Sequence, residues 1–254
     1  MSQDADLRGT PAFPSTRWSE LVAGPGQGDP DGAAARAAFE ALAVRYWRPV
    51  AAYVRARGAR DDDEARDATQ DFFVWMLESG FLARLDRSRG TFRGFIKRTL
   101  KNFLHDLERK RRTVRRGGTR NLLPLSGAEG DLDLPDPAGR DPEALLDDVW
   151  RQELLARALD GLEAELAARG KQRTFRVFRD YFLSEEELDY AAVAARHDMT
   201  GVDVSNALAA AKKRFRAHLR ACVLETVGGD EDLRAELAWL FGGENAGRAS
   251  EAGP

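Results

Sequence analysis

Apolar residues recur at three- and four-residue intervals along most of this 254-residue chain, and this spacing limits the possible folds more than any other feature. Residues at such intervals share one face of an α-helix, whereas a half-buried strand alternates apolar and polar residues at every second position. The recurring residues include Phe39, Leu42, Tyr46, Trp47, Val50 and Tyr53 in the first half, and Leu145, Leu146, Val149, Leu154, Leu155, Leu159, Leu162 and Leu166 in the second. No strand pattern interrupts them, so we predict an all-α protein.

A stretch of different composition, residues 119–141, separates two helical regions. It contains Pro124, Pro135 and Pro137, several glycines and a run of acidic residues, a composition typical of an extended segment without a core. We therefore predict two helical domains, residues 33–118 and 142–227, joined by a flexible acidic linker. Residues 1–32 are expected to be a flexible segment with a short helix. Residues 228–254 are expected to form a helix and a disordered tail, where the helix either caps the second domain or makes a regulatory contact.

Several residues mark the ends of the expected helices. The acidic run Asp61–Glu64 suits a helix N-terminus, where carboxylates oppose the positive end of the helix dipole. The sequence Asp141-Pro142-Glu143 is a second start signal. Pro49 lies inside the first apolar stripe, where the missing N–H and the ring predict a kink or a division of the helix.

The net charge of −3 conceals two concentrated basic stretches. The segment from Arg84 to Arg116 contains thirteen Lys and Arg residues and only three acidic residues. Residues 205–220 contain five cations and no acidic residue. An acidic chain with two basic stretches is expected to present two defined faces to nucleic acid. The alternative, that both stretches are ordinary solvated helix faces, stays open on charge alone.

The sequence offers little that would support catalysis. Its three histidines do not stand at metal-ligand spacing, and nothing pairs a nucleophile with a base, so we expect no enzyme activity, no metal and no cofactor. The single cysteine, Cys222, fits a reducing compartment. No apolar run approaches the roughly 20 residues that span a bilayer, and the N-terminus lacks the features of a secretory signal. We expect a cytoplasmic protein without membrane insertion.

The first basic stretch contains an amphipathic helix that begins at Phe92 and ends near Arg112. Its cations are expected to neutralise phosphates, and Asn102 has the groups to hydrogen-bond a base edge. Phe92, at the helix start, is the aromatic residue expected to stack on an unpaired base, whereas Phe95 and Phe103 are expected to belong to the core. The residues expected to face DNA on this helix are Phe92, Arg93, Lys97, Arg98, Lys101 and Asn102.

The second basic stretch lies in a predicted helix-turn-helix. A short helix at Leu188–Arg196 is followed by a turn at His197–Gly201 and by a long helix from Val202. In such motifs the N-terminal residues of the second helix meet base edges in the major groove. By position, Asp203, Ser205, Asn206 and Ala209 are expected to face the groove, while Lys212, Lys213 and Arg216 reach phosphates. The alternative is a pair of ordinary core helices.

Several strings of residues in the first half of the chain resemble those of a known family. The match lies in Asp63-Glu64-Ala65-Arg66-Asp67-Ala68-Thr69-Gln70-Asp71-Phe72-Phe73, in Phe81-Leu82-Ala83-Arg84 and in Arg89-Gly90-Thr91-Phe92-Arg93-Gly94-Phe95. Together with Thr16-Arg17-Trp18-Ser19 and Tyr46-Trp47-Arg48-Pro49, these strings resemble bacterial RNA polymerase sigma factors of the extracytoplasmic-function type. Residues 142–227 are similar to the fourth region of such factors, and the resemblance spans some 200 residues in the same order.

The resemblance implies partners and roles. It implies that Asp67, Gln70, Asp71 and Met76 bind core RNA polymerase, with Phe72 and Phe73 mostly internal. The loop and helix from Arg87 to Asn102, including Arg89, would bind the −10 element of promoter DNA around a flipped base. The helix from Val202 to Arg220 would bind the −35 element. The sequence leaves open whether an anti-sigma factor is a further partner.

The chain departs from the family pattern in its last basic helix. Family members usually place Arg or Lys where this chain has Ser205, Ala209 and Ala210, and Asp198 stands in the turn where Gly is common. Asp tolerates a positive φ at modest cost, but the missing cations put the strength of −35 recognition in doubt. The alternative function is a helix-turn-helix regulator that binds DNA without core polymerase.

Overall fold

The computed structural model describes residues 33–79, 91–113, 134–137, 139–227 and 229–242, and within these ranges every regular element is an α-helix. The predicted all-α class is confirmed for these residues. The helices are α2 (Ala33–Ala56), α3 (Asp62–Glu78), α4 (Phe92–Thr113), α5 (Pro142–Ala168), α6 (Gln172–Phe182), α7 (Tyr190–Arg196), α8 (Gly201–Leu224) and α9 (Asp230–Leu240).

The helices begin where short polar side chains can accept backbone N–H groups. The Asp61 carboxylate caps α3 by accepting from the Glu64 N–H at 2.8 Å. Asp141 caps α5 by accepting from the Ala144 N–H at 3.1 Å, with Pro142 at the first helical position. Both predicted start signals are confirmed, since each cap satisfies a donor that the helix itself leaves without a partner.

Pro49 does not divide α2, which continues from Ala33 to Ala56. Pro49 is itself buried, and so are Tyr46, Val50 and Tyr53 on the same helix. The lost hydrogen bond is thus offset by packing on both sides of the proline, a common way for tertiary contacts to outweigh helix propensity.

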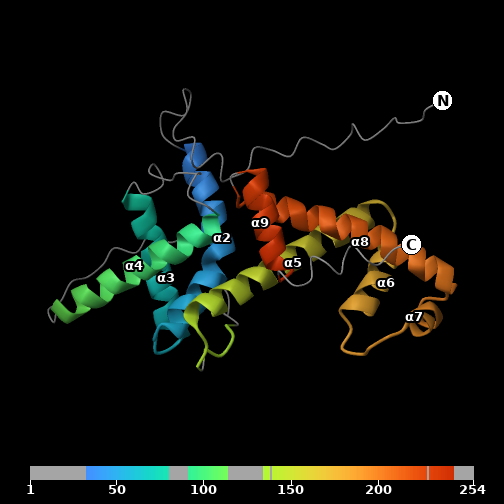
Figure 1. Cartoon of the computed structure of the whole chain (residues 1–254), viewed down its shortest axis with the longest axis horizontal. Coiled ribbons are helices and arrows are strands. Elements are labelled where there is room, and N and C mark those ends of the chain that lie inside the picture. The colour runs from blue at the N-terminus through green and yellow to red at the C-terminus, as the bar shows by residue number, and fades with distance from the viewer. Residues whose placement is uncertain (1–32, 80–90, 114–133, 138, 228, 243–254) are drawn as a thin grey trace.

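Long helices connect the two ends of the molecule. Figure 1 shows α2, α3 and α4 at one end, α6, α7 and the start of α8 at the other, and α5 and α8 between them. α5 packs along α2 over its first half and along α8 over its second. α9 lies near the middle, beside the end of α8.

Two main apolar clusters fill the interior of the described part of the chain, beside a minor group of Ala52, Leu145 and Val149. The larger contains residues of α2, α3 and α4, and also Leu146, Trp150 and Leu154 of α5, Leu219 and Val223 of α8, and Leu233 and Leu240 of α9. The smaller joins Leu162 and Leu166 of α5 with Phe175, Val177 and Phe178 of α6, Val193 of α7, and Val204, Leu208 and Ala211 of α8.

The border between these clusters therefore crosses α5 and α8 instead of following the predicted linker. Tyr46 of α2 stacks on Trp150 of α5 with ring centroids 4.2 Å apart, so the two predicted halves share a core at this point. Most of the predicted linker lies outside the described residues, and its flexibility stays a prediction.

Candidate nucleic-acid interface

The first candidate surface is the outer side of α3, where the resemblance placed the polymerase contacts. Asp67 is exposed, and Gln70 and Asp71 are half-buried. Met76 is fully buried in the larger cluster, so its side chain offers no surface to a partner in this structure. Phe72 and Phe73 are buried as expected. The side of α3 available to a partner is therefore polar and acidic.

Phe92, at the start of α4, does not occupy the position expected of a base-stacking residue. Its side chain is 1% exposed, and its ring meets Tyr46 edge to face at 4.7 Å. Its backbone N–H also donates to the Thr226 carbonyl at 3.3 Å. Phe92 is therefore not accessible to a base in this structure, because the start of α4 lies against α2 and the end of α8, and its contact with DNA stays a prediction. Phe95, expected in the core, is half-buried and stacks on Phe92 at 5.9 Å.

Two of the predicted DNA-binding cations on α4 are already paired with carboxylates. Arg93 donates to Asp147 Oδ1 of α5 at 2.7 Å and to both carboxylate oxygens of Glu236 on α9, at 2.6 and 3.1 Å. Lys97 donates to Asp147 Oδ2 at 2.6 Å. The Arg93 guanidinium also lies 3.5 Å from the ring centroid of Trp239. These partners come from elements far along the chain.

Burial and pairing act in opposite directions on Arg93. Burial lowers its pKa, but the hydrogen bonds and negative charges of Glu236 and Asp147 outweigh that effect and raise the pKa above its ordinary value. The guanidinium therefore stays charged, as the bidentate contact with Glu236 requires.

The other predicted DNA-binding residues on α4 are exposed to solvent, and those before α4 are outside the described part of the chain. Arg98 and Asn102 are exposed. Lys101 is 65% exposed and lies 3.9 Å from Glu143 of α5, a distance at which a surface ion pair contributes little. Arg87 and Arg89 belong to residues 80–90, outside the described part of the chain.

The second candidate surface is formed by α7, the connection His197–Thr200 and the first turns of α8. Asp198 adopts φ 49°, the positive value expected at this turn. The turn is held from α6, because Arg173 donates to the carbonyls of both His197 and Asp198, the latter at 2.7 Å. Sequence reasoning missed Arg173, whose partners are main-chain atoms that no residue pattern reveals.

The beginning of α8 is closed by a capping box. The Asp203 N–H donates to Thr200 Oγ1 at 3.2 Å, and the Thr200 N–H and hydroxyl donate to the Asp203 carboxylate at 3.3 and 2.6 Å. These hydrogen bonds lower the pKa of Asp203. The carboxylate predicted to face the groove is thus turned back toward the start of its own helix.

Most of the remaining predicted residues on α8 point to solvent. Val204, Leu208 and Ala211 are buried on the inner side of the helix. The outer side presents exposed Ser205, Asn206, Ala209, Ala210, Lys213 and Arg216. Lys212 is half-buried, with its Nζ 4.8 Å from the ring centroid of Phe182 on α6. The inner side of α8 is thus apolar and the outer side polar, with its exposed cations in the fourth and later turns.

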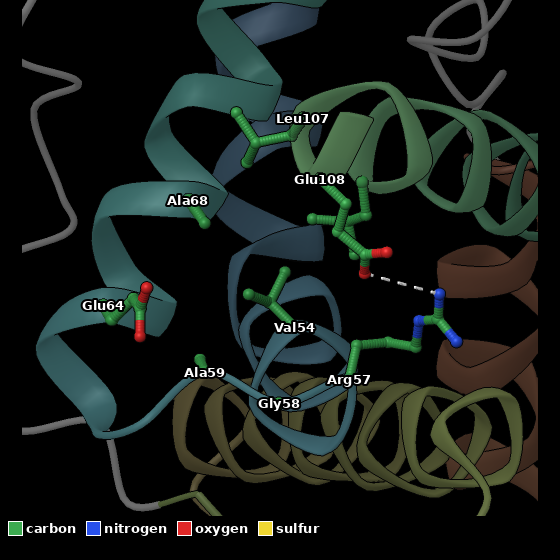
Figure 2. A pocket seen from close by; sticks show the side chains of 9 residues that line it. Val54, Arg57, Gly58, Ala59, Glu64, Ala68, Leu107 and Glu108 are labelled. Atoms are coloured by element: carbon green, nitrogen blue, oxygen red, sulfur yellow. Dashed lines mark ion pairs between the residues drawn. The ribbon is translucent and has the colours of Figure 1, made fainter. Parts of the chain in front are cut away.

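A small cavity of about 140 Å³ lies between α2, α3 and α4. Figure 2 shows its mixed lining: Val54, Ala59, Ala68 and Leu107 are apolar, and Arg57 forms an ion pair with Glu108 at 3.8 Å. None of the predicted site residues lines it. It is not the candidate site.

Three further observations concern metal sites, membrane spans and the single cysteine. Within the described ranges, no group of three or more His, Cys, Asp or Glu side chains is arranged to hold a metal ion. None of the helices in those ranges combines the length and the apolarity that crossing a bilayer requires. Cys222 is buried, and burial raises the pKa of its thiol.

Comparisons with protein-family models, curated proteins and solved structures found nothing that matches this chain. Any function must therefore be argued from the residues and their arrangement.

Proposed function

We propose that this protein is a sigma factor, a non-enzymatic cytoplasmic subunit that binds core RNA polymerase and directs it to a subset of promoters. In this proposal the outer side of α3 binds polymerase, α4 and the residues before it bind the −10 element, and α7 with α8 forms a helix-turn-helix for the −35 element. The smaller apolar cluster would be the core of that helix-turn-helix unit.

The observation that supports the proposal best is that two outward surfaces of different chemistry occur on one chain. The side of α3 around Asp67 is acidic and polar, whereas the outer side of α8 presents Asn206, Lys213 and Arg216. The second surface suits DNA, since amide groups bind base edges and cations bind phosphates. The first surface would repel DNA, so it suits a protein partner.

Run-off transcription tests the proposal. Core polymerase would be incubated with a pool of randomised promoter fragments, with and without the purified chain, and the transcripts sequenced from their 5′ ends. We expect discrete start sites that appear only with the chain, each preceded by shared sequence elements. An unchanged set of transcripts, at low salt and with the chain in excess, would contradict the proposal.

One observation favours the second candidate, a DNA-binding regulator that works without polymerase. Because Arg93 and Lys97 are paired internally, the most accessible nucleic-acid surface is that of α7 and α8 alone. A regulator of this kind would bind duplex DNA tightly by itself. The logarithm of its binding constant would fall with the logarithm of the salt concentration. Replacing Lys213 or Arg216 by Ala would reduce the size of that slope by about one for each cation removed.

A further inference from the structure

The basic side of α4 is covered by residues of two later helices, α5 and α9. Arg93 is bound by Asp147 of α5 and by Glu236 and Trp239 of α9, and Lys97 is bound by Asp147. Asp147 lies 54 residues after Arg93 and Glu236 lies 143 residues after it, so α4 meets these groups only through the tertiary fold.

The groups around Arg93 imitate the chemistry of a nucleic acid. Glu236 accepts two hydrogen bonds from the guanidinium, the same bidentate contact that a phosphate makes with arginine. Trp239 offers a flat aromatic ring 3.5 Å from the guanidinium carbon, where a base would otherwise stack. Asp147 bridges Arg93 and Lys97, as one phosphate could bridge two neighbouring cations.

These contacts leave no room for a second anion. The side chains of Arg93 and Lys97 are 12% and 17% exposed, and the Glu236 side chain is 3% exposed. A phosphate can reach either cation only if a carboxylate moves away. Removing one partner of a buried pair leaves an uncompensated charge, which strongly favours the closed arrangement.

α9 is suited to be the part that moves. It has 11 residues, and helices of this length are marginal in water without tertiary support. Leu233 and Leu240 bury its apolar side, and Glu236 lies between them on the same side. One short helix thus contributes both an apolar contact and the groups that cover Arg93.

We propose that α9 and the start of α5 form an internal clamp, in which Asp147, Glu236 and Trp239 occupy Arg93 and Lys97 in place of DNA until α9 is displaced. This inference rests on the proposed binding of DNA by α4. The apparent affinity of α4 for DNA is then reduced by the fraction of molecules in which the clamp is open.

The test compares the full-length chain with a variant that keeps the shapes of the clamp residues but removes their charges. In the double variant Asp147→Asn and Glu236→Gln, both carboxylates become amides of similar size. The matched control is Glu153→Gln, which neutralises a carboxylate of α5 that binds Arg48 of α2 at 2.5 Å. Fluorescence anisotropy would measure binding of a labelled single-stranded oligonucleotide and of its duplex at one fixed salt concentration.

We expect the double variant to bind DNA about 10- to 100-fold more tightly than the original chain, the gain that follows if the open state holds roughly 1–10% of the molecules. Glu153→Gln should bind like the original chain. Adding Lys97→Ala to the double variant should cancel most of the gain, because the released lysine is then missing. Hydrogen exchange in α9 should rise in the double variant and not in the control.

Two results would overturn the clamp. If the double variant shows unchanged hydrogen exchange in α9 and unchanged affinity for DNA, the contacts of Asp147 and Glu236 with α4 are purely structural. Faster exchange in α9 without tighter DNA binding would mean that the uncovered side of α4 does not bind DNA. Polymerase binding by the original chain, measured separately, tells whether the sigma-factor proposal fails as well.

Discussion

Gly161 of α5 lies directly against the His218 ring of α8. A Cβ added there would lie 2.7 Å from Nδ1 and 3.2 Å from Cγ of His218, both too close for an ordinary contact. The His218 ring is held by Glu165, with Nε2 and Oε2 2.9 Å apart, so it cannot move aside without losing that contact. Gly94, inside α4, differs, because a Cβ there would meet only Thr91 Oγ1 at an ordinary 3.5 Å.

The two glycines predict opposite effects of the same substitution. Gly94→Ala should raise the free energy of unfolding by about 0.5–1 kcal/mol, because alanine loses less backbone entropy in a helix. Gly161→Ala should lower it by about 1–3 kcal/mol, because the methyl group overpacks the contact with His218. Urea unfolding followed by circular dichroism measures both. Equal stabilisation by the two substitutions would show that α5 and α8 are not packed as described.

Single residues differ in how well the sequence predicts their position. Asp61, Asp141 and Asp198 were predictable because their roles depend on local backbone geometry. The burial of Met76 could have been found, since it lies at helical spacing from Phe72 and Phe73. The burial of Phe92 could not, because its partner Tyr46 belongs to another helix and no local pattern records that contact.

At the scale of elements, Asp203 stabilises the start of α8 and does not extend from its outer surface toward a partner. Asp203 completes the capping box with Thr200, which fixes where α8 begins and how its first turn is oriented. The residues after it, Ser205 and Asn206, are thereby presented outward from a well-defined helix start. The helix was predicted from its apolar spacing, but the capping role of Asp203 depends on the side-chain conformation.

The Asp203 cap predicts a pH dependence. Hydrogen bonds from Thr200 lower the pKa of Asp203 below its ordinary 3.8 in the folded state, so folding favours the ionised form. The stabilisation is fully present above the unfolded pKa and is lost as the pH falls through the folded value. The difference in unfolding free energy between the original chain and Asp203→Ala should therefore be larger at neutral pH than near pH 3. A pH-independent difference would contradict this role for the carboxylate.

α4 was predicted correctly as a helix, and its environment was not. Its apolar stripe and its cations follow from the sequence, but the sequence does not show that Arg93 and Lys97 meet carboxylates of α5 and α9. Ion pairs between residues this far apart leave no periodic pattern. The same holds for Arg173, which holds the turn before α8 through main-chain carbonyls.

At the scale of the whole molecule, the contact between the predicted halves explains why the basic helix is covered. Tyr46, Phe92 and Trp150 join α2, α4 and α5 in one aromatic group, and this places Asp147 beside α4. The large apolar cluster extends from there through α8 to α9. If the protein is a sigma factor, α4 must be uncovered before it binds the promoter, and polymerase is the partner that could supply the necessary binding energy.

The side of α3 around Asp67 is the surface proposed to bind core RNA polymerase. Asp67 is exposed, so Asp67→Arg should leave the fold intact, and Asp160→Arg places the same charge reversal at an exposed position of α5. The most direct measurement is co-elution of each full-length chain with core polymerase in size-exclusion chromatography at low salt. We predict that the original chain and Asp160→Arg co-elute with polymerase and that Asp67→Arg does not. Absence of a complex with the original chain would contradict the proposed function, and equal co-elution of all three would contradict the assignment of this surface.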